Sequence, residues 1–370
     1  MSDKIFQVSP KIGDLEKKYV NDVLESGWIT ESKYTEKLVD KVKDLTGSKY
    51  AYPAPNGTLA LYLSLLALDL PKGSDVLVPS FTFMASASSV VFAGHRPVFF
   101  DVEDDTWHGD LSSAENAITP KTKAIMPVHM YGSAMNMPNV LAFSKKHKLK
   151  VIEDAAQAVG VRQSGRHMGT FGDISIFSFF ADKTVTMGEG AFIVTNDDEI
   201  SEKVKLLRNQ GRPNSGTFIH PALGMNFRIT EMQAAMGLAQ LENLDDIAFR
   251  KRHNYFRYAT ILSTIPDIHA QSIPADVEFI PFRFAFTSSN MFLYKAALEK
   301  EGVQTRSFFY PLDKQPCMIG VSSSVDCPVS ESLFNNGLAL PVHLDLVDSD
   351  IDFICSIIIA TAEGINDRNT

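Results

Sequence analysis

Short apolar runs alternate with longer segments of helical spacing from about residue 50 to residue 200, and this alternation constrains the fold more than any other feature. The runs are four or five residues long and rich in Val, Ile and Phe, as buried strands are. They are Asp75–Pro79, Pro97–Asp101, Ala124–Val128, Val151–Asp154, Ile174–Phe177 and Ala191–Thr195. Strands that alternate with helices predict an α/β fold, in which helices cover a mostly parallel sheet.

Helices are expected between these strands and beyond them. The clearest candidates in the strand-rich region are Gly57–Leu68 and Asn139–His147. A third candidate is Thr230–Leu244, where Thr230 and Gln233 have the spacing of a capping box at a helix N-terminus. We expect helices of this kind to cover the sheet.

A second region follows the basic stretch near residue 248. It contains the apolar run Ile280–Phe286, an amphipathic helix around Met291–Glu301 and a closing helix after Asp348. A chain of 370 residues is long enough for one large and one smaller domain. We place the boundary near residue 245, with a large domain and N-terminal arm in residues 1–245 and a smaller α/β C-terminal domain in residues 246–370.

Charge and composition argue against several classes of function. The formal net charge of −9, without a long basic run, argues against nucleic-acid binding. Cys317, Cys327 and Cys355 have neither a metal-ligand spacing nor an even disulfide count, so we expect no metal site and a reducing, cytoplasmic setting. The polar N-terminus does not resemble a signal peptide, and no apolar stretch approaches the ~20 residues that cross a membrane.

Polar residues gather where the predicted strands end and helices begin, which is where parallel sheets place functional groups. Asn56, Gly57 and Thr58 precede a helix whose first N–H groups can hold a phosphate, although such a pair is more often only a turn and cap. Glu153 and Asp154 end an apolar strand. A carboxylate at that depth implies a cationic partner, unless the acid caps the following helix.

Lys183 follows the strand-like run that ends at Ser178 and precedes a glycine-containing turn. A single loop lysine is usually solvated. Here, however, three features occur together: an amine that can form an imine, an acid-bearing strand end before it, and a Gly-Thr helix start further upstream. These are the amine, the carboxylate and the phosphate cradle that pyridoxal 5′-phosphate requires, so the pattern predicts this cofactor.

Seven motifs occur in order over nearly the whole chain. They are SGWIT (26–30), NGTLAL (56–61), VPSFTFMAS (78–86), ITPKTKAIMPVHMYG (118–132), VIEDAAQAVG (151–160), FGDISIFSFFADKTVTMGEG (171–190) and GMNFRITEMQAAMGLAQL (224–241). Together they resemble the DegT/DnrJ/StrS group of sugar aminotransferases, which have the aspartate-aminotransferase-like fold of type I pyridoxal phosphate enzymes. The lysine motif and TRSFFYPL (305–312) most resemble the nucleotide-sugar 4-aminotransferases typified by GDP-perosamine synthase.

The resemblance implies specific roles for the site residues. It implies that Lys183 forms an imine with the cofactor and that Asp154 holds the proton of the pyridinium nitrogen. The further cofactor-binding residues that it implies are Gly57, Thr58 and Ser178 at the phosphate, Gln157 at the phenolic oxygen, Phe83 stacked on the ring, and Asn226 at the phosphate of a neighbouring subunit. It therefore also implies a homodimer with shared active sites.

The activity that the resemblance implies is transfer of an amino group from glutamate to a nucleotide-linked 4-keto-6-deoxy sugar. Flat or cationic side chains suit bases and diphosphates, although such residues more often serve the core or the surface. The candidates for nucleotide and sugar binding are Trp28, Arg228, Arg306, Tyr310 and His343. A 3-aminotransferase, a sugar dehydratase and a non-catalytic regulatory protein that binds the cofactor remain open as alternatives; the related 3-dehydratases carry histidine where this chain has Lys183.

Three positions depart from the pattern of the family. Asp182 follows Ala181 where the family commonly has a small residue and Asn, or Pro-Thr, before the lysine. Asp313 replaces a frequent histidine in the C-terminal motif, and Asn136 stands where aspartate is frequent. We expect the acid at position 182 to influence the proton affinity of Lys183.

Overall fold

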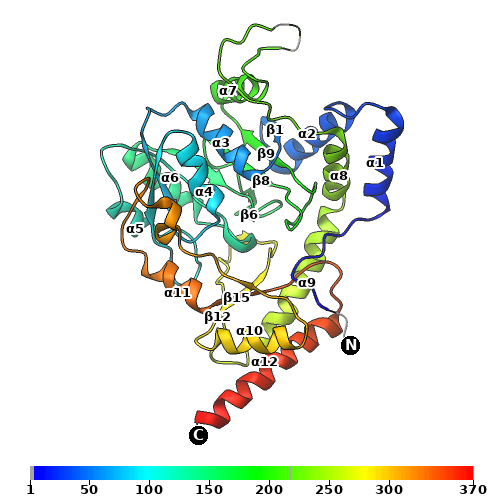
Figure 1. The fold of residues 1–370 in the computed structure, drawn as a ribbon, viewed down its shortest axis with the longest axis vertical. Coiled ribbons are helices and arrows are strands. Elements are labelled where there is room, and N and C mark those ends of the chain that lie inside the picture. The colour runs from blue at the N-terminus through cyan, green and yellow to red at the C-terminus, as the bar shows by residue number, and fades with distance from the viewer. Residues whose placement is uncertain (1–3, 215, 217, 370) are drawn as a thin grey trace.

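The computed structural model describes residues 4–214, 216 and 218–369, and a large twisted sheet lies at its centre (Figure 1). Its strand order is β1-β9-β8-β5-β4-β2-β3-β14. In that order the strands are Tyr50–Ala54, Ala191–Thr195, Ile174–Ser178, Lys150–Asp154, Thr122–Ile125, Asp75–Pro79, Arg96–Phe100 and Ser323–Ser324. Only β9 runs antiparallel to its neighbours within this sheet. The prediction of an α/β fold with a mostly parallel sheet is confirmed, and all six predicted strands are present, with ends shifted by at most three residues.

Helices cover both faces of this sheet because alternate strand residues point to opposite sides. In β2, Val76 and Val78 pack in one core cluster, whereas Leu77 packs in the other. The first cluster includes residues of α3 (Gly57–Leu68), α4 (Met84–Phe92) and α7 (Asp198–Arg208). The second includes residues of α2 (Lys33–Thr46), α6 (Met137–His147) and α8 (Glu231–Glu242). The predicted capping box is confirmed, since Thr230 and Gln233 exchange hydrogen bonds at the start of α8.

The C-terminal part of the chain forms a second, antiparallel sheet with strand order β10-β12-β15-β13. Its strands are His269–Ala270, Phe284–Thr287, Gly337–Leu340 and Arg306–Ser307. The helices that accompany it are α9 (Leu244–Leu262), α10 (Met291–Lys300), α11 (Pro328–Asn336) and α12 (Asp348–Asn369). Helices α9, α10 and α12 pack together below the large sheet in Figure 1. The predicted helices near residue 291 and after residue 348 are confirmed.

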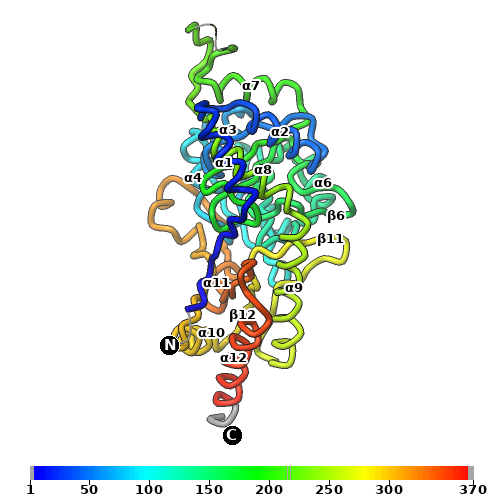
Figure 2. The backbone as a smooth tube through the Cα atoms, turned by 90° about the vertical axis from the view of Figure 1, so that its right-hand side faces the viewer, coloured from blue at the N-terminus to red at the C-terminus, as the bar shows by residue number. Residues whose placement is uncertain are grey.

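Several contacts cross the predicted domain boundary. Helix α9 begins at Leu244, close to that boundary. Strand β14 joins the large sheet beside β3, and β11 (Val277–Glu278) pairs with β6 (Arg162–Gln163), which pairs in turn with β7 (Arg166–His167). The chain before α1 (Asp14–Ser26) runs down beside the C-terminal part in Figure 2, where Ile5 forms a parallel bridge with Val303. The division at residue 245 therefore stays a prediction.

The remaining elements are short. They are α5 (Leu111–Asn116) and three 3-10 turns, Met130–Gly132, Leu312–Lys314 and Pro316–Met318. No helix in the described part of the chain is both long enough and apolar enough to cross a membrane.

Candidate active site

A cavity of about 500 Å³ opens at the carboxyl ends of β5 and β8, beside the first turn of α3. The segment before β12, together with β13, closes its other side. Eight of the predicted site residues line it: Gly57, Thr58, Phe83, Asp154, Gln157, Ser178, Lys183 and Arg306. The fold thus brings together residues that lie up to about 250 positions apart in the chain.

Lys183 lies in the loop after β8, where its backbone N–H donates to the carbonyl of Phe180 (2.9 Å). Its Nζ lies 4.6 Å from the centroid of the Phe282 ring. Burial lowers the pKa of Lys183, and the nearby carboxylates of Asp182 and Asp154 partly oppose that shift. A lysine of lowered pKa supplies more neutral amine, the form that attacks a carbonyl carbon.

Asp154 ends β5 and is buried at the cavity wall. One carboxylate oxygen accepts a hydrogen bond from Ser86 Oγ (2.7 Å), and the other accepts from the backbone N–H of Ala156 (3.2 Å). Ser86 Oγ in turn lies 3.2 Å from Thr82 Oγ1. Among the described residues no cationic side chain forms an ion pair with Asp154, so this buried carboxylate faces the cavity ready for a cationic ligand.

Glu153, the preceding acid, has a different role. Its carboxylate accepts hydrogen bonds from the backbone N–H groups of Gly169, Phe171 and Gly172, at 2.6–2.8 Å. Its fourth partner is His129 Nε2, at 3.2 Å. Because His129 Nδ1 accepts from a backbone N–H, its Nε2 carries the proton and donates to Glu153. The two acids of the motif thus divide into one that holds a loop and one that faces the cavity.

The α3 end of the cavity has the shape of a phosphate cradle. Asn56 caps α3 through a hydrogen bond from the backbone N–H of Leu59 (3.0 Å), and the chain enters the helix through Gly57 and Thr58. A Cβ added to Gly57 would lie 3.3 Å from both Cβ and Oγ of Ser178. Glycine at this position therefore keeps open the space between the helix N-terminus and the Ser178 hydroxyl.

Gln157 occupies a defined orientation at the cavity edge. Its Oε1 accepts a hydrogen bond from the backbone N–H of Tyr131 (2.9 Å). Its Nε2 lies 3.8 Å from Met130 Sδ, a weak acceptor, and has a second N–H that can donate to a ligand. Tyr131 has a φ of 55°, and Gly132 follows with a φ of 87°. A Cβ at Gly132 would lie 1.9 Å from the carbonyl oxygen of Ile280, so only glycine fits between these two segments.

The five other predicted residues do not line the cavity. Trp28 is 60% exposed, and Tyr310 is exposed with its ring against Phe334. Arg228 donates to Asn209 Oδ1 (2.9 Å), and His343 Nε2 lies 3.0 Å from the carbonyl oxygen of Phe6. Asn226 is exposed and accepts from the backbone N–H of Arg228 (3.2 Å). Their roles at a nucleotide, or in a neighbouring subunit, stay predictions.

Other cavity residues escaped the analysis of the sequence. They include Thr82, His129, Tyr131, Glu189, Phe282, Arg283 and Phe309. His129 directly follows the predicted strand Ala124–Val128, so the rule of strand ends was the signal that could have identified it. Phe282 and Arg283 lie inside the run Ile280–Phe286, and no local signal distinguishes them from core residues.

All three departures from the family pattern have structural roles. Asp182 lines the cavity and forms an ion pair with Arg283. Asp313 accepts a hydrogen bond from Ser80 Oγ and lies 3.8 Å from Lys314 Nζ, so it joins the 312–314 turn to the residue after β2. Asn136 is the N-cap of α6, where its side chain accepts from the backbone N–H of Asn139 (3.1 Å). None of the described residues forms a cluster of three or more metal-ligating side chains.

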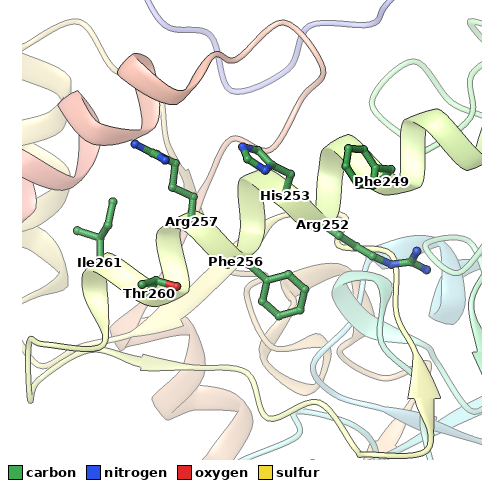
Figure 3. A pocket seen from close by; sticks show the side chains of 7 residues that line it. All are labelled: Phe249, Arg252, His253, Phe256, Arg257, Thr260 and Ile261. Carbon is green, nitrogen blue, oxygen red and sulfur yellow. The ribbon is translucent and has the colours of Figure 1, made fainter.

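A second hollow is lined by side chains of α9 (Figure 3). Its charged side chains already have protein partners. Arg257 pairs with Asp348 and Asp352, and His253 pairs with Asp348. It contains neither a lysine nor a carboxylate among its lining residues, so we place the chemistry in the cavity of Lys183.

The comparisons with known proteins agree with this cavity. A model of the DegT/DnrJ/EryC1/StrS aminotransferase family matches residues 10–359. The GDP-perosamine synthase of Escherichia coli O157:H7 is 36% identical over 353 residues, covering 94% of this chain and 96% of that protein. A UDP-N-acetyl-3-dehydro-alpha-D-glucosamine 3-aminotransferase of Acidithiobacillus ferrooxidans is 37% identical over 88% of each chain. The crystal structure of S. venezuelae DesV in complex with a ketimine intermediate has a TM-score of 0.90 at 29% identity and covers 94% of both chains.

These matches confirm the expected aspartate-aminotransferase-like fold and the expected cofactor. The cavity has what pyridoxal 5′-phosphate needs: the Lys183 amine, the buried Asp154 carboxylate, and the open cradle between Gly57 and Ser178. From these residues and from the extent of the matches we conclude that the chain is a pyridoxal phosphate-dependent sugar aminotransferase and belongs to the DegT/DnrJ/EryC1/StrS aminotransferase family.

Proposed function

We propose that this enzyme transfers the amino group of glutamate to the keto carbon of a nucleotide-linked 4-keto-6-deoxy sugar. The observation that carries the proposal is the similarity to GDP-perosamine synthase over 94% of the chain. All the cavity residues also fall within residues 10–359, which the family model matches. Arg283 and Arg306 add two guanidinium groups to the C-terminal side of the cavity. Guanidinium groups bind carboxylates and phosphates, the anionic groups of the proposed donor and acceptor.

The bound cofactor supplies an aldehyde that links to amines and a ring that withdraws electrons from the neighbouring carbon. Lys183 would hold the cofactor through its Nζ, and the same amine, when free, would move a proton at the substrate carbon. Asp154 keeps a proton on the ring nitrogen, because its buried carboxylate favours a cation beside it. Gln157 would donate from Nε2 to the phenolic oxygen, and the first N–H groups of α3 would hold the phosphate together with Ser178.

We propose further that the active enzyme is a homodimer with shared sites. Phe83 lines the cavity, yet its side chain is 58% exposed in the single chain. Beyond α7, the segment at the top of Figure 1 presents Leu223, which is 98% exposed, and Phe218. Asn226 ends that segment. Exposed apolar side chains of this kind favour burial against a second copy, which is the arrangement that would bring Asn226 to a neighbouring phosphate.

Amination at carbon 3 is the second candidate, because the 3-aminotransferase relative is as similar to this chain as the perosamine synthase is. A dehydratase is less well supported, since Lys183 stands where that branch has histidine. The test is a coupled glutamate assay against nucleotide-linked 4-keto and 3-keto sugars, with mass spectrometry of the products and the Lys183→Ala variant as the blank. Amination of a 4-keto-6-deoxy sugar supports the proposal. Amination of 3-keto sugars alone, loss of water without glutamate, or no turnover with any sugar would each contradict it.

A further inference from the structure

Asp182 immediately precedes Lys183 and is the acid by which this chain departs from the family pattern. Its Oδ2 lies 2.8 Å from Nη2 of Arg283. Both side chains are nearly buried, with 12% of Asp182 and 4% of Arg283 exposed. The acid beside the lysine is therefore not a free negative charge, because Arg283 neutralises it.

Each member of this pair depends on the other. Among the described residues, Asp182 and Arg283 have no other side-chain hydrogen bond or ion pair, and Asp182 Oδ1 is buried without a hydrogen-bond partner. A buried charge that loses its only partner is strongly destabilised or changes its protonation state. Removal of one member therefore leaves an uncompensated charge one residue from the reactive lysine.

The pair joins two regions of the molecule across the cavity. Asp182 belongs to the loop after β8, and Arg283 directly precedes β12. The segment that carries Arg283 is fixed independently: Phe282 donates its backbone N–H to the carbonyl of Tyr131 (2.9 Å), and Lys251 Nζ donates to the carbonyl of Pro281 (3.3 Å). The backbone around Arg283 is thus held in place by contacts that do not involve Asp182, and the Asp182 side chain pairs with Arg283 there.

The ring of Phe282 completes the arrangement. The guanidinium carbon of Arg283 lies 4.2 Å from the centroid of this ring, and Nζ of Lys183 lies 4.6 Å from it. Lys183 and Arg283 therefore contact the same aromatic ring. Asp182 links the two residues a second time, because it precedes Lys183 in the chain and its carboxylate pairs with the Arg283 guanidinium. We infer that Asp182 and Arg283 act as a pair of positioning residues, which hold Lys183 against Phe282 and balance the charge next to its amine.

Four charged groups act on the Lys183 amine. Asp182 on its own loop and Asp154 at the end of β5 raise its pKa, whereas Arg283 and Arg306 lower it. Lys251, on α9, also interacts electrostatically with Arg283. Burial and, to a smaller extent, Arg283 lower the pKa of Lys251 to about 7. Because Asp182 and Arg283 act with opposite signs, their effects partly cancel while both are present, and each single variant exposes the effect of the other.

The experiment is an absorbance titration of the cofactor-loaded enzyme against pH, at constant ionic strength, for the wild type, Asp182→Asn, Arg283→Gln and the double variant. In Asp182→Asn the uncompensated guanidinium disfavours the protonated Lys183–cofactor linkage, so its midpoint should fall by about one pH unit. In Arg283→Gln the uncompensated carboxylate favours the protonated linkage, so the midpoint should rise. The double variant should return close to the wild type.

Two further variants keep the test decisive. Arg283→Lys retains the charge and should keep a near wild-type midpoint, even if Arg283→Gln fails to fold. Asp198→Asn removes an acid from an exposed ion pair with Lys49 and should leave the midpoint unchanged. Single variants that both shift the midpoint in the same direction, or that leave it unmoved, would overturn the inference, as would a double variant that departs further from the wild type than either single one. None of these readings depends on which sugar the enzyme aminates.

Discussion

The two sides of the cavity are built differently. On the sheet side, polar groups have several hydrogen bonds each: Glu153 accepts from three backbone N–H groups and His129, and Asp154 accepts from Ser86 and Ala156. On the C-terminal side, the side chain of Arg283 has one ion pair among the described residues, with Asp182. The side chain of Arg306 has no hydrogen bond or ion pair in that part of the chain, although its backbone pairs with β15. The polar groups on the sheet side are therefore held by several hydrogen bonds each, whereas on the C-terminal side the Arg306 side chain is available to bind a substrate.

This comparison orders the expected effects of mutations. Changes on the sheet side should remove the chemistry or the cofactor. Changes on the C-terminal side should alter proton affinity and substrate binding while the cofactor stays bound.

The largest expected effect belongs to Lys183→Ala. Without the amine there is no covalent hold on the cofactor and no group to move the proton, so we expect turnover to be abolished. Steady-state assays with glutamate, together with thermal unfolding to verify the fold, measure this. Lys49→Ala, at an exposed ion pair, is the matched control and should keep full activity. Measurable turnover by Lys183→Ala would remove the lysine from the mechanism.

The adjacent acids separate catalysis from stability. Asp154→Asn should lower kcat on the order of 100-fold or more, with little change in unfolding temperature, because the amide cannot hold the ring proton. Glu153→Gln should instead lower the free energy of unfolding by about 3 kcal/mol. The carboxylate accepts hydrogen bonds from three buried N–H groups, and the amide that replaces it is uncharged and has only one acceptor oxygen. Kinetics and denaturant unfolding of both variants provide the comparison. If the two variants had the same profile, the division of roles between the acids would be wrong.

Ser178→Ala tests the phosphate cradle on the sheet side. Loss of one hydrogen bond to a charged group should weaken cofactor binding about 10-fold. A fluorescence titration of apo-enzyme with pyridoxal phosphate measures the dissociation constant. Ser175→Ala, in the same strand, removes a buried hydroxyl without a hydrogen-bond partner and is the matched control. Equal affinity of the Ser178→Ala and wild-type enzymes would place the phosphate elsewhere.

Arg306→Gln gives the smallest expected effect and tests the C-terminal side. Because the side chain of Arg306 lines the cavity without a hydrogen-bond or ion-pair partner among the described residues, we expect it to contact the anionic part of a substrate. Its loss should raise KM for one substrate up to about 10-fold, while kcat and the cofactor dissociation constant change little. Initial rates with each substrate varied in turn measure the split. A fall in kcat at unchanged KM would instead assign Arg306 to the chemical step.

The sheet side could be predicted from sequence because its residues follow strands. Asp154 and Ser178 end buried apolar runs, and Gly57 begins a helix, so a local pattern placed each of them at one edge of a parallel sheet. The pattern could not separate Glu153 from Asp154. Both residues are buried, and only the position of the 169–172 loop shows which carboxylate is already satisfied.

The C-terminal side could not be predicted in the same way. Arg283 reaches the cavity through the contact of its segment with Tyr131 and Gly132, about 150 residues earlier in the chain. Such long-range contacts leave no periodic signal in a single sequence. Arg306 was identified by residue type, but the same reasoning selected Tyr310 and His343, which lie outside the cavity. Residue type alone therefore gave candidates without positions.

The central claim is that Lys183 is the lysine that holds the cofactor between these two sides. Borohydride reduction of the cofactor-loaded enzyme, followed by peptide mapping, tests it most directly. We predict that the cofactor is found on the peptide that contains Lys183. Burial lowers the pKa of Lys251 as well, and we predict that this second lysine stays unmodified. Label on Lys251, or on no lysine of the cavity, would contradict the account.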